Sequence, residues 1–344
     1  MPEVNYHFIP MGSVAEASPG KVYIDVGNDF TPGVLDHHHP KAPDGCTATL
    51  ALNHPDYICS QLACDQLTIV LHENPDLDGI TGAYFARLHV LGETLNEQHQ
   101  LWAEYVCKVD QGFTKLNPKA PLSPYSIFMM RMHQTREKQP EELNMAMLLA
   151  GFEFIEQMLS ALRNGHDLNN HAWIEGAFPL ESKLVRDDFS QYLNDLNRAA
   201  ITTFDLPKKT GPGHETVSGL WIEQPKSILF KSWGRGDQEH SHSPKGFIFL
   251  GVQINKTRFI LSVQPDASVW LKGLGDALEL AEQKKRAQTG EIRKGHNRPG
   301  YQSPDPWYSG NSPLHHYTII DSPRCGSLLS FSDVKKILRE LTTQ

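Results

Sequence analysis

The chain has 344 residues, of which 39% are hydrophobic and 21% are charged, and its formal net charge is −8. This length allows two ordinary domains, and the composition excludes an intrinsically disordered protein. The negative charge argues against binding nucleic acid through a large basic surface, because neutralising phosphates requires clustered Lys and Arg. We see no apolar run near the ~20 residues that cross a bilayer, and no signal peptide. Five cysteines without a Cys-x-x-Cys pair fit reduced thiols. We therefore expect a cytoplasmic protein without membrane contact.

In the first part of the chain, apolar stretches predict buried strands that alternate with helices. Strands are predicted at residues 21–26 and, most clearly, at 67–71, a continuous β-branched run typical of parallel sheets. Helices are predicted at 47–62, with an irregular middle at His54-Pro55, and at 80–91. Strand, polar loop and helix form the layout of an α/β domain, in which ligands bind beyond the carboxyl ends of the strands.

The rest of the chain is predicted to be helical first and then mixed. Apolar residues at three- and four-residue spacing predict helices over 141–200, and Gly, Pro and Lys predict a linker at 206–213. The later elements are expected to be strands at 217–222, 228–230, 246–252 and 258–263, a helix at 274–286, and a closing helix from 332. The predicted fold is thus α/β, with an N-terminal parallel-sheet domain (1–125), a helical connector (126–205) and a smaller α+β domain (206–344).

Acidic and histidine side chains gather at the ends of the predicted N-terminal strands. The residues are Asp25, the triplet Asp36-His37-His38, the group His72, Asp76 and Asp78, and Asp110 after the apolar Tyr105-Val106-Cys107. Each carboxylate alone is typical of a turn or helix cap. Together, four acidic strand ends would crowd carboxylates at one sheet edge, where divalent cations are the natural counter-charge. His-x-x-x-Asp-x-Asp, with its two carboxylates alternating along an extended segment, offers a ligand set suited to Mn²⁺ or Mg²⁺.

These motifs resemble those of the DHH phosphoesterase superfamily, over roughly residues 20–115. The resemblance rests on Asp25-Val26-Gly27, Asp36-His37-His38, His72-x-x-x-Asp76-x-Asp78-Gly79 and Val109-Asp110, with Cys46-Thr47-Ala48 as a similar helix start. That superfamily includes pyrophosphatases, exopolyphosphatases, nanoRNases, cyclic-dinucleotide phosphodiesterases and single-strand exonucleases. In its usual order the His-x-x-x-Asp-x-Asp motif comes first, then the lone Asp, then the triplet. Here the lone Asp25 and the triplet come first, as in a circular permutation, which leaves the subfamily open.

The resemblance implies two divalent cations, Mn²⁺ rather than Mg²⁺ by preference, and a role for each matched residue. One cation would be held by His72, Asp76 and Asp25, and the other by Asp78, Asp25, His37 and Asp110. His38 would face the substrate phosphate, with Asp36 orienting His37 or His38. His39 has no counterpart in the family and is expected to face solvent. The presence of His72 favours a pyrophosphatase- or nanoRNase-style site.

The C-terminal domain is predicted to contact the substrate through basic residues near tryptophans. The expected residues are Lys231, Arg235, Arg298 and Arg324. Trp233 and Trp307 in Gly- and Pro-rich loops suit base stacking, but equally suit a small core with turns. The run Lys284-Lys285-Arg286, with Arg293, Lys294 and Arg298, is expected to form one positive face on the acidic protein.

The sequence therefore predicts a metal-dependent phosphodiesterase, a hydrolase of the nuclease type, that acts on a nucleotide or oligonucleotide through a metal-activated water. One alternative is an inorganic pyrophosphatase or exopolyphosphatase. Another is a nucleotide-binding sensor or interaction protein that keeps the metal ligands without turnover. A homodimer, and a partner protein bound through the C-terminal domain, stay open.

Overall fold

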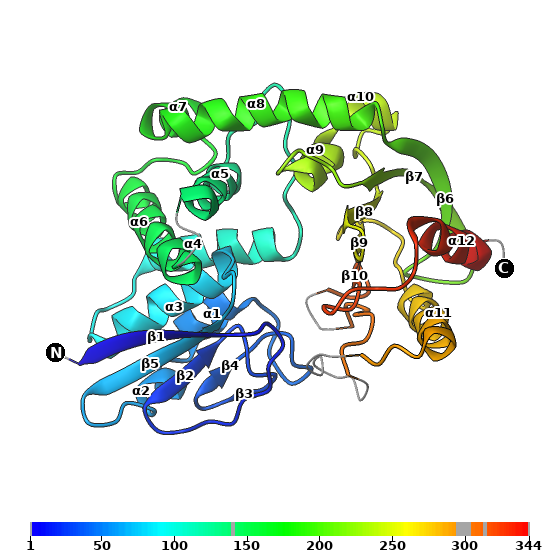
Figure 1. Cartoon of the computed structure of the whole chain (residues 1–344). Coiled ribbons are helices and arrows are strands. Elements are labelled where there is room, and N and C mark those ends of the chain that lie inside the picture. Colours follow the sequence, from blue (N-terminus) through cyan, green and yellow to red (C-terminus); the bar gives the residue numbers. More distant parts are fainter. Residues whose placement is uncertain (1, 139–141, 294–303, 312–314, 343–344) are drawn as a thin grey trace. The chain divides into compact units, whose positions relative to one another are not determined.

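The computed structural model describes residues 2–138, 142–293, 304–311 and 315–342 (Figure 1). It is a mixed α/β structure whose first sheet is largely parallel, and the described residues form twelve helices. The chain divides into two compact units. Unit 1 comprises Met1–Gly112 and Leu122–Ser182, and unit 2 comprises Phe113–Pro121 and Lys183–Gln344. The segment 126–205, predicted as a separate connector, is therefore shared between the units.

The sheet of unit 1 has five strands in the order β1-β5-β2-β4-β3. They are β1 (Glu3–Ile9), β2 (Lys21–Ile24), β3 (Phe30–Thr31), β4 (Val34–Leu35) and β5 (Gln66–His72). β1, β5, β2 and β4 run parallel, and only β3 is antiparallel to its neighbour. The interior of β5 is almost fully buried, as its continuous apolar sequence predicts.

Helices of unit 1 pack against this sheet and against one another. They are α1 (Thr47–Asn53), α2 (Pro55–Cys59), α3 (Leu77–Val90), α4 (Glu97–Asp110), α5 (Pro124–Lys138), α6 (Leu143–Arg163) and α7 (His171–Ala177), followed by α8 (Pro179–Leu196), which continues into unit 2. The break between α1 and α2 lies at His54-Pro55, where the sequence predicts it. Helix α3 packs closely on β2, because a Cβ atom at Gly82 would lie 2.8 Å from Cγ2 of Ile24.

Helix α6 is long and apolar enough to cross a membrane by length and composition, although the sequence suggested no such run. Its buried side chains, which include Met147, Phe154, Ile155 and Met158, belong to the core of unit 1. A core helix of a soluble protein passes the same test, and this burial accounts for its apolar composition.

Unit 2 contains a second five-stranded sheet in the order β10-β9-β8-β7-β6. Its elements are β6 (Ala200–Pro207), β7 (His214–Glu223), α9 (Phe230–Gly236), α10 (Gln238–Ser241), β8 (Phe249–Asn255), β9 (Arg258–Val263), α11 (Leu274–Thr289), β10 (Ile319–Asp321) and α12 (Phe331–Thr342). Only β7 and β8 pair in parallel.

Two predictions for this part of the chain are wrong. Residues 206–213 end one strand and turn into the next, so they form a hairpin and not a linker. Residues 228–230 are not a strand: they lead into α9, because the Asp188 carboxylate accepts hydrogen bonds from the amides of Ile228 and Leu229 at 2.7 and 3.1 Å.

Candidate metal centre

The candidate site lies where the parallel strands of unit 1 end. Strand β5 ends at His72, β2 is followed by Asp25, and β4 is followed by Asp36 and His37. Because these strands are neighbours that run in the same direction, their carboxyl ends meet at one edge of the sheet. The side chains there are withdrawn from solvent: Asp25 is 5% exposed, His37 and His72 are 2% exposed, and Asp78 is 3% exposed.

The six expected ligands fall into two groups, in each of which the ligand atoms lie within 4.8 Å of one another: Asp25 with His72 and Asp76, and His37 with Asp78 and Asp110. Asp25 connects the groups. Its Oδ2 lies 3.3 Å from Nε2 of His72, and its Oδ1 lies 3.3 Å from Nδ1 of His37. These buried carboxylates and imidazoles can hold a metal ion.

The backbone around Asp25 is unusual in a way that positions its carboxylate. Asp25 has φ +60°, in the left-handed region that aspartate tolerates better than most residues. Two residues later, Gly27 has φ +119°, and a Cβ atom there would lie 2.7 Å from Cγ1 of Val34. The Asp-Val-Gly motif therefore turns the chain sharply at the end of β2, and a side chain at Gly27 would obstruct that turn.

Gly79 leaves room beside the cluster. A Cβ atom at this position would lie 3.3 Å from Oδ2 of Asp25 and 3.6 Å from Nε2 of His72. The glycine belongs to the first turn of α3, where its conformation does not require glycine. The space next to two ligand atoms fits a bound cation.

The hydrogen bonds of both buried histidines determine which nitrogen faces the cluster. Nδ1 of His72 donates to the carbonyl of Glu73 at 2.8 Å, which leaves Nε2 toward Asp25. The Thr47 hydroxyl donates to Oδ1 of Asp25 at 3.0 Å, so it accepts from Nδ1 of His37 at 2.8 Å. Nε2 of His37 is then directed at Oδ2 of Asp110, 3.3 Å away. Such orientation by a second group is typical of metal-binding histidines.

The alternation of Asp76 and Asp78 predicted an extended segment, but the structure places both residues at the start of α3. Asp76 is the N-cap of α3, and its Oδ1 accepts the amides of Asp78 and Gly79 at 3.1 and 3.0 Å. Asp78 lies in the first turn, and its carboxylate accepts the amides of Thr47 and Ala48, both at 2.8 Å. Asp78 thus joins the start of α1 to α3, while its oxygens remain within reach of His37.

Asp110 reaches the cluster from a helix and not from a strand, which corrects the prediction for this residue. It is the last residue of α4, whose buried face is formed by His99, Trp102, Ala103 and Val106 at helical spacing. The apolar Tyr105-Val106-Cys107 belongs to this helix. Within the described residues, Oδ2 of Asp110 is buried and makes no hydrogen bond, although Nε2 of His37 lies 3.3 Å away, and such an oxygen is suited to binding a cation.

The charges of the cluster are strongly coupled. Burial, and then the neighbouring Asp25, raise the pKa of Asp78 to about 6. Burial also raises the pKa of Asp110 well above its usual range, whereas hydrogen bonds from His37 and His72 outweigh burial and hold the pKa of Asp25 well below its usual range. The pKa of His72 rises to about 9, because the hydrogen bond and charge of Asp25 outweigh the effect of burial. In this arrangement imidazolium groups compensate the carboxylates, and a cation can do the same.

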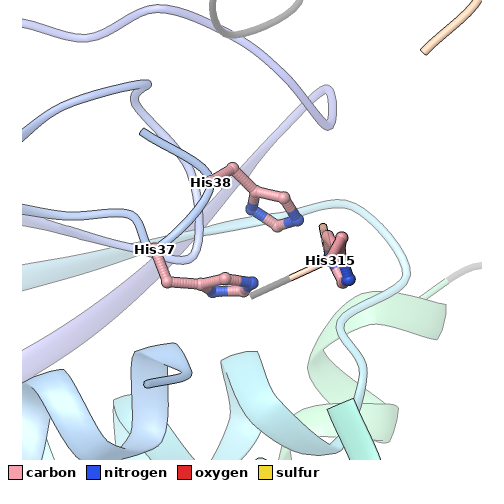
Figure 2. Close-up of side chains that lie close together, drawn as sticks. All are labelled: His37, His38 and His315. Atoms are coloured by element: carbon pink, nitrogen blue, oxygen red, sulfur yellow. The ribbon is translucent and has the colours of Figure 1, made fainter. Parts of the chain in front are cut away.

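His38 lies next to His37, with ring centroids 4.0 Å apart, and both project from the loop after β4 (Figure 2). Its Nδ1 donates to Oδ1 of Asp36 at 2.9 Å, so Nε2 is the nitrogen that can meet a substrate. Asp36 is buried and also accepts the amides of Asn28 and His38. The structure thus pairs Asp36 with His38 and not with His37. His39 is half-buried, and its ring lies 3.8 Å from the carboxylate of Asp29.

The residues expected to bind substrate in the C-terminal part have varied surroundings. Arg235 is buried, and its guanidinium donates to the carbonyls of Phe247 and Ile248 at 2.8 and 2.6 Å and to the Ser262 hydroxyl at 2.7 Å. These contacts give Arg235 a structural role in unit 2, in place of the expected one. Lys231 is exposed and Arg324 is half-buried, while Arg298 lies outside the described residues.

The tryptophans and the basic run have structural partners as well. Trp233 and Trp307 are each 1% exposed, and their indole N–H groups donate to Asp188 and Glu282, so they belong to cores and not to stacking surfaces. Three cations of the expected positive face are paired with acids: Lys285 with Asp333, Arg286 with Glu282, and Arg293 with Glu279. Lys294 and Arg298 lie outside the described residues.

The sequence analysis did not identify what Thr47 and Gly79 do in the site. A threonine at a helix start is usually explained as a cap, and nothing in the local sequence reveals that its hydroxyl joins His37 to Asp25.

The chain was compared with models of protein families, with curated proteins and with solved structures, and no significant match was found.

Proposed function

We propose that this chain is a phosphoester hydrolase of the DHH type that depends on two divalent cations, Mn²⁺ by preference. The observation that carries the proposal is the pair of ligand groups joined by Asp25 at the carboxyl edge of a parallel sheet. Two carboxylates and two imidazoles are withdrawn from solvent there, while Asp110 is half-buried and Asp76 is exposed. Oxygen-rich sites with imidazole suit Mn²⁺ and Mg²⁺.

Each residue of the centre has a distinct task in this proposal. Two bound cations supply charge neutralisation at the phosphoryl oxygens and a lowered pKa for an attacking water. Asp25 holds the two ligand groups together, while Glu73 and Thr47 orient His72 and His37 through the hydrogen bonds described above. His38, held by Asp36, presents Nε2 toward a phosphate oxygen, where a donor stabilises the growing negative charge.

The substrate class rests on the chemistry of this centre alone. Our first choice is a nucleotide-containing phosphodiester: a short oligonucleotide, single-stranded nucleic acid or a cyclic nucleotide. Pyrophosphate and polyphosphate remain the second choice, because the argument against them depended on exposed aromatic residues. Because Trp233 and Trp307 are buried, the aromatic residues that favoured a base-bearing substrate no longer do so.

The test combines metal analysis with a substrate screen. We expect close to two Mn²⁺ per chain after equilibration with Mn²⁺, and hydrolysis of at least one member of a panel of single-stranded DNA, RNA dinucleotides, cyclic nucleotides and pyrophosphate. Asp25→Asn should abolish hydrolysis. Asp44→Asn, at an exposed aspartate, is the matched control and should not. Metal binding without turnover of the whole panel would favour the sensor alternative, and a single Zn²⁺ would contradict the two-cation centre.

A further inference from the structure

Unit 2 contains a pocket of about 770 Å³ that is built entirely from its own residues. Its walls come from the segment 113–121, from the second half of α8, and from the loops around α10. The volume lies within the range of roughly 300–1,000 Å³ that is typical of small-molecule sites. None of its lining residues belongs to the candidate metal centre.

Two walls of the pocket, the segment around Leu116 and the segment around Gly246, contact the backbone of α9 closely. The amide of Leu116 donates to the carbonyl of Ser232 at 3.0 Å, and a Cβ atom at Gly236 would lie 2.0 Å from the carbonyl oxygen of Leu116. On the other side, a Cβ atom at Gly246 would lie 2.2 Å from the carbonyl oxygen of Arg235. Glycines at these positions let both segments contact α9 directly, so these walls are formed before any ligand arrives.

The lining combines an apolar wall with an excess of positive charge. The apolar part consists of Pro118, Phe189, Leu193 and Pro244. The cations are Lys115, Lys119 and Lys245, against the two carboxylates of Asp237 and Glu239, in a chain whose net charge is −8. Arg235 also lines the pocket, but its guanidinium is bound to the carbonyls of Phe247 and Ile248. Lys115 lies 3.4 Å from Asp266, whereas Lys119 and Lys245 are exposed and have no ion pair within the described residues.

A histidine held by a buried carboxylate completes the lining. Nδ1 of His240 donates to Oδ2 of Asp237 at 2.9 Å, and the hydroxyl of Tyr192 donates to the same oxygen at 2.7 Å. Asp237 is 5% exposed and Tyr192 is 1% exposed, so the imidazole is anchored from inside the unit. With Nδ1 used in this way, Nε2 of His240 has no hydrogen-bond partner in the described part of the chain.

We propose that this pocket binds a nucleoside phosphate, with its base against Phe189 and Leu193 and its phosphate among Lys119, Lys245 and Nε2 of His240. A flat apolar ring suits the half-buried Phe189, which packs on Trp233 with ring centroids 4.8 Å apart and is thereby held in place. Flexible ammonium groups suit a phosphate as point charges. The site goes beyond the proposed hydrolase, because it shares no residue with the metal centre.

The experiment measures binding to the full chain in EDTA, where hydrolysis does not interfere. AMP, ADP and ATP are titrated by calorimetry. The intrinsic fluorescence of the six tryptophans, of which Trp233 packs on Phe189, gives a second readout. We expect saturable binding of at least one of them, and weaker binding of adenosine and of inorganic phosphate, each of which offers half of the contacts.

Variants locate the site. Lys119→Ala combined with Lys245→Ala should weaken binding by about tenfold or more, because charge-assisted contacts to phosphate are lost. His240→Gln and Leu193→Ala should each weaken it less. Lys284→Ala, an exposed lysine of α11, is the matched control and should leave it unchanged. Unchanged thermal midpoints verify that the variants fold.

Two outcomes overturn the proposal: no saturable binding of any of the three nucleotides, or binding that the double lysine variant leaves intact. Asp25→Asn separates this site from the metal centre. Nucleotide binding in EDTA should persist in that variant even though hydrolysis is lost. If hydrolysis is never detected but nucleotide binding follows the lysines, the proposed function fails and the pocket stands.

Discussion

Asp78 has two roles that oppose each other in the metal-free protein, and Asp78→Ala separates them. The carboxylate accepts the buried amides of Thr47 and Ala48, each at 2.8 Å. A buried amide left without an acceptor costs roughly 1–3 kcal/mol, so the variant should lose roughly 2–6 kcal/mol of unfolding free energy from this source. We therefore expect the alanine variant to be less stable wherever the charge of Asp78 is absent.

The charge works in the opposite direction. Burial and Asp25 raise the pKa of Asp78 from 3.8 to about 6. When the pKa of an acid is higher in the folded state than in the unfolded state, ionising it destabilises the folded protein. The penalty is small at low pH and grows as the pH rises toward the pKa of the folded state. The difference between 3.8 and 6 corresponds to a penalty of about 3 kcal/mol at pH 7.5, but only about 1 kcal/mol at pH 4.5. Removing the carboxylate relieves this penalty.

The assay is urea unfolding in EDTA, of the natural chain and Asp78→Ala, at pH 4.5 and pH 7.5. The stability deficit of the variant should be larger at pH 4.5 by about 2 kcal/mol, the difference between the two penalties. Asp78→Asn also removes the charge, and because each carboxylate oxygen accepts one of the two amides, its NH2 group leaves one amide without an acceptor. Its deficit should likewise be larger at pH 4.5 than at pH 7.5. A deficit that is equal at both values, or larger at pH 7.5, would refute the electrostatic reasoning. The absence of any deficit at pH 4.5 would refute the role given to the two amides.

Three further predictions concern the same centre. Asp110→Asn removes the ion pair with His37 but also a buried carboxylate whose pKa is raised well above its usual range, and these effects oppose each other; unfolding in EDTA should show a stability within about 1 kcal/mol of the natural chain, while metal analysis shows one Mn²⁺ fewer per chain. Thr47→Val removes the hydroxyl between His37 and Asp25; calorimetry should show Mn²⁺ affinity reduced by about 10- to 100-fold, and an unchanged affinity would contradict the orienting role. The pKa of His72 is raised to about 9 and that of His37 is raised well above its usual range, so Mn²⁺ must displace protons at neutral pH; the affinity should rise at least tenfold per pH unit between pH 7 and about 8.5, and a flat profile would show that neither histidine binds the metal.

Elements with strong local signals were predictable from sequence, and those that depend on distant partners were not. The apolar run of β5 and the interruption at His54-Pro55 were predicted correctly because each is visible within a few residues. Strand β1 was missed, since Glu3–Ile9 has no fully buried residue and owes its conformation to pairing with β5. Residues 228–230 are apolar enough for a strand, but the Asp188 carboxylate, some forty positions earlier, holds their backbone in another conformation.

In the candidate site, too, the residues with local sequence signals were predicted and those that depend on distant contacts were not. Strand ends rich in Asp and His indicated Asp25, His37 and His72 directly, because parallel strands bring their carboxyl ends together. Asp110 was correctly predicted to lie near the other ligands, but it was assigned to the end of a strand and lies at the end of a helix. A short apolar run does not distinguish a strand from a buried helix face. The Thr47 bridge depends on the packing of α1 against the sheet edge, which no local pattern encodes.

The order of the strands in space is compatible with the proposed DHH type, although the motifs follow a different order in the chain. In the chain, Asp25 and the Asp36-His37-His38 triplet precede His72, whereas the resemblance leads one to expect the reverse. Across the sheet, however, the neighbours are β5, β2 and β4, which carry the His72 motif, Asp25 and the triplet in that succession. A metal centre depends on which strand ends are adjacent, and the connections between parallel strands run outside the sheet and can change without moving those ends. The ligand groups that the proposal requires are therefore adjacent in space despite the order of the motifs in the chain, with Asp25 between His72 and His37.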